Sequence, residues 1–98
     1  MNRFPTFDLT GQVALVTGAA RGLGNAISLA LAHAGADVAL GLRDVNAPGS
    51  LPTQIEAMGR QVIPLQMDVR HLDQIFQAVD DTVRHFGRID ILSNRDSI

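Results

Sequence analysis

The chain has 98 residues, 46% of them hydrophobic, and carries eight basic against ten acidic side chains, a formal net charge of −2. This predicts one small domain and excludes the basic surface that a nucleic acid or an anionic membrane would require. Without cysteine there is no disulfide or thiolate metal site, and without ligand spacing among the three histidines no metal site is predicted.

The first predicted elements are a strand, a glycine-rich turn and a helix. Val13–Val16 is a short, continuous apolar run, as in a strand buried on both faces of a sheet. After the turn, Leu23–Ala34 repeats apolar side chains at helical spacing, and Gly35 stands where helices commonly end on a left-handed residue. These features predict a strand–turn–helix unit over residues 13–35.

Strands and helices continue to alternate along the rest of the chain. Ser50 is expected to cap a helix, Pro64 suits a strand at the edge of a sheet, and Gly87 is expected to end the last helix. The expected strands are Val38–Leu42, Val62–Met67 and Ile89–Leu92, and the expected helices are Leu51–Met58 and Leu72–Phe86.

This alternation predicts an α/β fold with three layers around a parallel, Rossmann-like sheet of about four strands. Right-handed crossovers with a reversal after the third strand give the sheet order 3-2-1-4. The clearest amphipathic stripe lies on the last helix and comprises Leu72, Ile75, Phe76, Val79, Val83 and Phe86. The first two helices should cover one face of the sheet, and the last helix only part of the other.

The turn between the first strand and the first helix carries the chemistry. Gly18 permits a tight turn out of the strand, Gly22 lets backbone approach a phosphate without an intervening Cβ, and Gly24 lets the helix pack closely on the sheet. The unpaired N–H groups at the helix start would then face the phosphates. Such a turn is built to hold the diphosphate of a dinucleotide.

The same residues carry a family resemblance. Thr17-Gly18-Ala19-Ala20-Arg21-Gly22-Leu23-Gly24 resembles the T-G-x-x-x-G-x-G turn of the short-chain dehydrogenase/reductases, and the likeness extends over residues 8–94. It includes Asp68-Val69 and the run from Phe86 to Leu92. The resemblance implies that residues 1–98 form a single, partial Rossmann domain, the N-terminal, cofactor-binding half of an enzyme. The intact relative would transfer hydride between NADP(H) and a carbonyl or secondary alcohol.

The choice of cofactor depends on the end of the second strand. In the family's register Leu42 takes the usual acidic position and Arg43 the next, a pattern that resembles NADP-binding members, to which Arg21 would add a second cation. Asp44 supports the alternative, NAD, because it lies about twenty residues after the last glycine; a third interpretation makes Arg43 and Asp44 a solvated loop pair.

The resemblance also assigns the adenine side of the site. It places Asp68 and Val69 against the adenine, although Asp68 could instead, or in addition, cap the following helix. The predicted cofactor-binding residues are Gly18, Arg21, Gly22, Leu23, Gly24, Arg43, Asp68, Val69 and Asn94.

The end of the chain departs from the family pattern. Where the family continues Asn-Asn-Ala-Gly, this chain reads Asn94-Arg95-Asp96-Ser97, which suggests a truncated or rearranged terminus. The catalytic Ser and the Tyr-x-x-x-Lys pair that the resemblance implies are missing, and the sequence contains no Tyr and no Lys. We therefore assign no catalytic residue. A non-catalytic nucleotide-binding or interaction module, or a fragment without function, is the alternative interpretation.

Two expectations concern location and assembly. No apolar run has the length of a membrane span, and the first residues lack the apolar core of a secretory signal, which predicts a cytoplasmic protein. The last strand would form an uncovered, apolar sheet edge, and such an edge invites pairing with a second copy. The charged residues Arg95 and Asp96 could blunt that edge.

Overall fold

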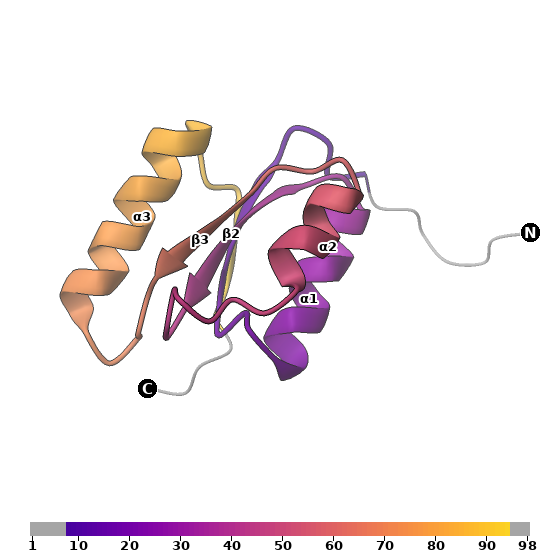
Figure 1. The fold of residues 1–98 in the computed structure, drawn as a ribbon. Coiled ribbons are helices and arrows are strands. Elements are labelled where there is room, and N and C mark those ends of the chain that lie inside the picture. Colours follow the sequence, from indigo (N-terminus) through magenta and orange to yellow (C-terminus); the bar gives the residue numbers. More distant parts are fainter. Residues whose placement is uncertain (1–7, 95–98) are drawn as a thin grey trace, which may run out of the picture.

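A parallel sheet with helices on both faces organises residues 8–94, the part of the chain that the computed structural model describes (Figure 1). The sheet has four strands in the order β3-β2-β1-β4, as predicted. Helices α1 and α2 lie on one face and α3 on the other. In chain order the elements are β1 (Val13–Thr17), α1 (Gly22–His33), β2 (Asp37–Leu42), α2 (Leu51–Ala57), β3 (Val62–Gln66), α3 (Leu72–Phe86) and β4 (Ile91–Ser93).

The core lies on both faces of the two central strands. All five residues of β1 are buried, as the continuous apolar run predicted. On one face of the sheet, Leu40 and Leu42 of β2 form an apolar cluster with Leu51 and Ile55 of α2. On the other face, Leu15 belongs to a second cluster beneath α3. Each fully buried leucine or isoleucine contributes roughly 1.5–3 kcal/mol relative to an exposed one, so these clusters fix the sheet on which the site is built.

The sequence predicted the position of one edge strand, β3, but not the first residue of the other, β4. Pro64 lies in β3, an edge strand, as expected for a residue that cannot donate to a neighbour. Strand β4 begins at Ile91, so the expected start at Ile89 was wrong. Asp90 bonds Val13 through both its backbone and its side chain: its amide donates to the Val13 carbonyl at 2.8 Å, and its carboxylate accepts from the Val13 amide at 2.9 Å and from Arg88 at 2.7 Å. The side chain thus takes the Val13 amide just before β4 begins.

Glycines end two helices as predicted, but one expected cap does not form. Gly35 and Gly87 have φ values of +110° and +86° after α1 and α3. Ser50 precedes α2 without making a capping bond; its hydroxyl instead accepts from Gln54 Nε2 at 2.8 Å, which corrects the predicted cap. Over residues 8–94, no helix is both long and apolar enough to span a membrane.

Helix α3 packs on the sheet with only part of its apolar stripe, because Ile75 and Phe86 pack against the cluster around Leu15 while the other members of the stripe are exposed. Ala78 and Thr82 are its buried residues, and the Thr82 hydroxyl donates to the Ala78 carbonyl at 2.7 Å. Phe76 is 65% exposed, and Leu72, Val79 and Val83 of the same stripe are also exposed. Most of the stripe thus lies on an exposed flank of α3.

Candidate functional site

The glycine-rich turn has the geometry that its sequence predicted. Gly18 and Gly22 adopt positive φ values of +60° and +61°, which residues other than glycine rarely adopt. The amide of Ala19 donates to the carbonyl of Gly41 at 3.3 Å, so the turn is attached to β2. A Cβ on Gly24 would overlap the carbonyl oxygen of Gly18, so only glycine lets α1 begin this close to β1.

The start of α1 has the character of an anion site. Its N-cap residue, Arg21, has extended backbone and no side chain caps the helix; its first turn holds no acidic residue. A Cβ built on Gly22 would meet no atom within 4 Å, so there is open space beside the backbone. The amides of a helix start and its dipole favour negative charge, and a diphosphate group therefore fits the residues present.

A cavity of about 570 Å³ opens directly in front of this turn. Five of the predicted cofactor-binding residues line it, together with Asp44 and two alanines that the sequence did not single out. The lining residues are Gly18, Ala20, Arg21, Leu23, Gly24, Arg43, Asp44 and Ala47. A volume of this size is in the range of small-molecule sites, which is sufficient for part of a dinucleotide.

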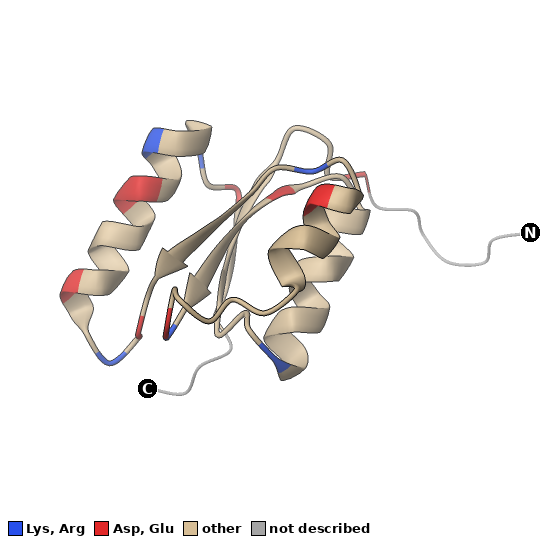
Figure 2. Cartoon of the chain, viewed as in Figure 1, with Lys and Arg blue, Asp and Glu red and all other residues tan. Residues whose placement is uncertain are grey.

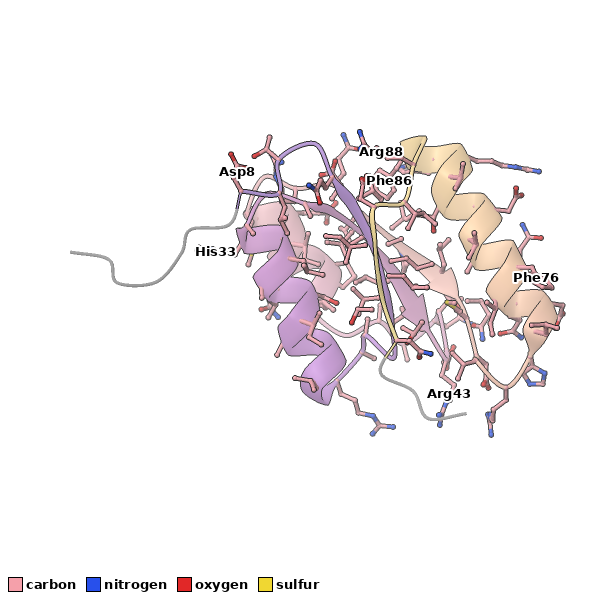
Figure 3. The ribbon with its side chains drawn as sticks, turned by 180° about the vertical axis from the view of Figure 1, so that it is seen from behind. Asp8, His33, Arg43, Phe76, Phe86 and Arg88 are labelled. Carbon is pink, nitrogen blue, oxygen red and sulfur yellow. The ribbon has the colours of Figure 1, made fainter. Side chains whose placement is uncertain are left out.

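Charged residues of both signs lie at the edge of the sheet where the strands end, and Arg70 there is paired with Asp68. In Figure 2 basic residues lie at the start of α1, after β2 and after β3, all at this edge, and Figure 3 labels Arg43 there, away from Phe86 and Arg88 at the opposite end. Arg21 and Arg43 are exposed, and within residues 8–94 neither forms an ion pair with an acidic side chain. Two cations therefore remain available to a bound anion.

Leu42 and Asp44, the two other positions at the end of β2 considered for contact with the ribose, both interact with other parts of the chain. Leu42 is 1% exposed and packs in the core with Leu51 and Ile55. The Asp44 carboxylate accepts from the Asn46 amide at 3.0 Å, which closes a turn within the loop. Both observations leave Arg43 as the side chain at this position with an uncommitted charge.

Asp68 lies buried at the carboxyl end of β3 and pairs with a residue that the sequence analysis missed. The Arg70 guanidinium donates to both carboxylate oxygens of Asp68, from Nη2 to Oδ2 at 2.6 Å and from Nε to Oδ1 at 2.9 Å. The hydrogen bonds from Arg70 hold the pKa of the Asp68 carboxyl well below its ordinary value of 3.8. Asp68 does not cap α3, whose N-cap residue is His71, so that alternative was wrong. An arginine two residues after the aspartate was the available signal.

The other four predicted residues lie at the same edge but outside the cavity lining: Gly22, Asp68, Val69 and Asn94. Val69 is buried beside Asp68. The side chain of Asn94, just after β4, accepts from the Thr17 hydroxyl at 2.9 Å, joining the ends of β4 and β1. Arg95 and Asp96, whose charges could blunt the sheet edge, lie outside the described residues. Residues 8–94 contain no group of three metal-ligating side chains.

Comparison with known proteins places these features in a family. A family model described as short chain dehydrogenase matches residues 12–98. The chain is 41% identical over 85 residues to the hydroxynaphthalene reductase of Aspergillus fumigatus, a match that covers 86% of this chain and 31% of the relative. The chain spans about a third of the length of the curated relatives it matches.

Solved structures agree with the fold. A short chain dehydrogenase from Burkholderia cenocepacia in complex with NADP is 41% identical, with a TM-score of 0.85 over 92% of this chain and 37% of that one. A short chain dehydrogenase from Mycobacterium paratuberculosis bound to NAD is 31% identical, with a TM-score of 0.80 over 87% of this chain and 36% of that one. The chain is thus similar to proteins that hold either dinucleotide.

Proposed function

The chain belongs to the short chain dehydrogenase family of NAD(P)-binding oxidoreductases, and from that premise we propose that its glycine-rich turn binds a dinucleotide with preference for NADP. The observation that carries the proposal is the uncapped start of α1, which opens into a cavity lined by Arg21 and Arg43, neither of which forms an ion pair with another of residues 8–94. The diphosphate would lie against the amides of Gly22, Leu23 and Gly24, where the open space beside Gly22 admits a phosphate oxygen.

The preference for NADP follows from charge at the end of β2. A 2′-phosphate on the adenosine ribose is favoured by an arginine there, whereas a carboxylate that accepts from the 2′-hydroxyl favours NAD. The position that would carry the carboxylate is Leu42, which is buried in the core. Arg43 and Arg21 line the cavity from β2 and from the turn, so a phosphate between them would meet positive charge on two sides.

The adenine side of the site is proposed on the resemblance. Asp68 and Val69 would lie against the adenine ring, with the Asp68 carboxylate accepting from the exocyclic amine. Asp68 Oδ1 already accepts from the Arg70 amide at 3.0 Å and from Arg70 Nε at 2.9 Å, whereas Oδ2 accepts from Nη2 at 2.6 Å and from the shared Nε at 3.2 Å. The exocyclic amine would therefore bond Oδ2, in place of the longer contact to Nε. Asn94 would contribute from the end of β4, beside the turn that carries Gly18.

Calorimetric titration with NADPH and NADH tests this proposal. The unmodified chain should bind NADPH more tightly, and Arg43→Gln should remove most of that preference while leaving the affinity for NADH nearly unchanged. Arg84→Gln is the matched control, because Arg84 is equally exposed but lies on α3 with Asp80 as its partner. Tighter binding of NADH than NADPH by the unmodified chain would refute the role given to Arg43.

The reaction of the whole enzyme is proposed to be reduction of a carbonyl or oxidation of a secondary alcohol. The nicotinamide ring supplies or accepts the hydride when the cofactor is bound. Proton transfer needs a positioned acid–base group of suitable pKa. The family's tyrosine and lysine have no counterpart in this sequence, which has neither residue type. The contribution of residues 1–98 is therefore to bind and orient the dinucleotide.

We also propose that copies of the chain associate through an apolar surface between α3 and β4. Leu72, Phe76, Val79 and Val83 are exposed along one flank of α3, where Figure 3 labels Phe76. Leu92 of β4 is paired with Leu15, which packs beneath α3, so Leu92 projects to the same side and is 62% exposed.

This α3–β4 surface adjoins the outer edge of β4, which pairs with no other strand within residues 8–94. An exposed strand edge beside exposed apolar side chains is a template for a second copy, because pairing satisfies backbone groups while it buries apolar area. The same edge in each copy would make the contact self-complementary, as a two-fold dimer requires.

A further inference from the structure

The loop that carries Arg43 is hydrogen-bonded to the side chain of Gln66, which lies on a different strand. Gln66 is the last residue of β3, and its amide reaches across to the segment that follows β2. Gln66 Oε1 accepts from the Val45 amide at 3.0 Å, and Gln66 Nε2 donates to the Arg43 carbonyl at 2.6 Å. The backbone on both sides of Asp44 is therefore attached to β3. The loop's own bonds, from the Asn46 amide to the Asp44 carboxylate and from the Ala47 amide to the Asp44 carbonyl, both lie within the loop and cannot orient it relative to the sheet.

A second glutamine extends this attachment to the other end of the site. Gln74, in the first turn of α3, accepts at Oε1 from Gln66 Nε2 at 3.3 Å and from the Asp68 amide at 2.9 Å. One continuous set of hydrogen bonds therefore runs from the backbone of Asp68 through Gln74 and Gln66 to the backbone of Arg43. It crosses the carboxyl edge of β3 and β2, where the dinucleotide site opens.

We infer that Gln66 is a positioning residue for cofactor specificity: it holds residues 43–45 so that the Arg43 guanidinium is presented to a 2′-phosphate. The inference rests on the proposed function of Arg43. Neither glutamine lines the cavity, so their action on the cofactor is through the loop. Gln74 links the backbone of Asp68 to the same amide, so ordering one end of the site favours the ordered form of the other.

The physical effect is on the population of the binding-competent loop. Without Gln66 the loop loses two hydrogen bonds to β3 and samples further conformations, only some of which present Arg43 to the ribose. The apparent affinity for a ligand that needs Arg43 falls by the competent fraction, while a ligand that does not need Arg43 is unaffected. Losing bonds of this kind corresponds to roughly a three- to tenfold change in that fraction.

The test uses two probes that differ only in the phosphate concerned, adenosine 2′,5′-bisphosphate and 5′-AMP, titrated into the chain and its variants. Gln66→Met keeps the length of the side chain and removes its polar atoms. It should weaken binding of the bisphosphate about three- to tenfold and leave that of 5′-AMP unchanged. Gln61→Met is the matched control, since Gln61 precedes the opposite end of the same strand. In an Arg43→Gln background, Gln66→Met should have no further effect on the ratio of the two affinities.

Amide hydrogen exchange measured on the chain without ligand gives a second readout. The Val45 amide should exchange faster in Gln66→Met than in the unmodified chain and in Gln61→Met. Equal weakening of both probes, an unchanged affinity ratio, or unchanged Val45 exchange would each overturn the role of Gln66. An unmodified chain with no preference for the bisphosphate would instead refute the proposed NADP preference. In that case faster Val45 exchange would still support Gln66 as the residue that holds the loop, and unchanged exchange would overturn it.

Discussion

The α-carbon of Gly24 stands so close to Gly18 that a Cβ on Gly24 would occupy the position of the Gly18 carbonyl oxygen. This contact joins the end of β1 to the first turn of α1, six residues apart in the sequence. It brings the start of the helix against the end of the strand and aims the first amides of α1 at the cavity. The third glycine of the turn thus acts through packing rather than through contact with a ligand.

Gly24→Ala should therefore destabilise the fold. Gly24 lies within α1 and has no positive φ, so its replacement is penalised by overlap and not by backbone conformation. Overpacking of this kind costs about 1–3 kcal/mol in the free energy of unfolding. Urea denaturation measures it, with Ala26→Ser as the control, since that variant adds one heavy atom at an exposed position of the same helix. Equal stability of the two variants would show that the turn relaxes without strain.

Local patterns were sufficient to predict the sheet and the turn. The continuous run of β1 is buried throughout, and glycines with positive φ stand where the turn and the ends of α1 and α3 require them. The strand order follows from the alternation of elements and the handedness of crossovers. These features depend on backbone sterics and on short-range periodicity, and both can be inferred from neighbouring residues in the sequence.

Contacts between segments distant in the sequence could not be predicted in the same way. The Asp90 carboxylate accepts from the Val13 amide just before β4 begins, a contact across 77 residues. Gln66 and Gln74 have no signature, because an exposed glutamine reads as a solvated polar residue until the fold shows its partners. The apolar stripe of α3 predicted the helix correctly but its packed face only in part, because Ile75 and Phe86 pack against the core while the small residues Ala78 and Thr82 are the buried ones.

The pairing of Asp68 with Arg70 predicts a specific response to acid. Because the folded-state pKa of Asp68 lies below 3.8, its charged form contributes stability above that pH, and the contribution is lost as the pH falls below it. The unmodified chain should thus be more stable than Asp68→Asn at neutral pH, and the difference in free energy of unfolding should narrow below pH 3.8.

Carboxyl NMR titration checks the cause of this response. Hydrogen bonding from Arg70 is the largest contribution to the lowered pKa, so in Arg70→Met the Asp68 carboxyl should titrate closer to 3.8. An Asp68 that titrates near 3.8 in the unmodified chain would mean that the two-point contact with Arg70 does not persist in solution. Arg70 is 63% exposed, so salt should weaken the pairing in part.

The 98-residue chain by itself should not reduce ketones with NADPH. It contains no tyrosine and no lysine, and in the described part of the chain no other acid–base pair lines the cavity beside the glycine turn. Purified chain assayed against a panel of ketones should give no NADPH oxidation above the background of a Gly22→Asp variant, in which a carboxylate blocks the phosphate position. Turnover by the unmodified chain that this variant abolishes would contradict the prediction.

Association through the α3–β4 surface should depend on its apolar side chains. Sedimentation velocity over a wide range of concentrations should show the unmodified chain shifting from monomer to dimer or larger species. The double variant Phe76→Ser and Val83→Ser should remain monomeric, because both residues are exposed on the flank of α3 and their loss removes apolar area without opening the core. Met58→Ser is the control, since Met58 is a comparably exposed apolar residue that follows α2 on the other face of the sheet. If the unmodified chain stays monomeric throughout, this surface does not drive association, and solvation of the flank and of the β4 edge outweighs the gain from burying them.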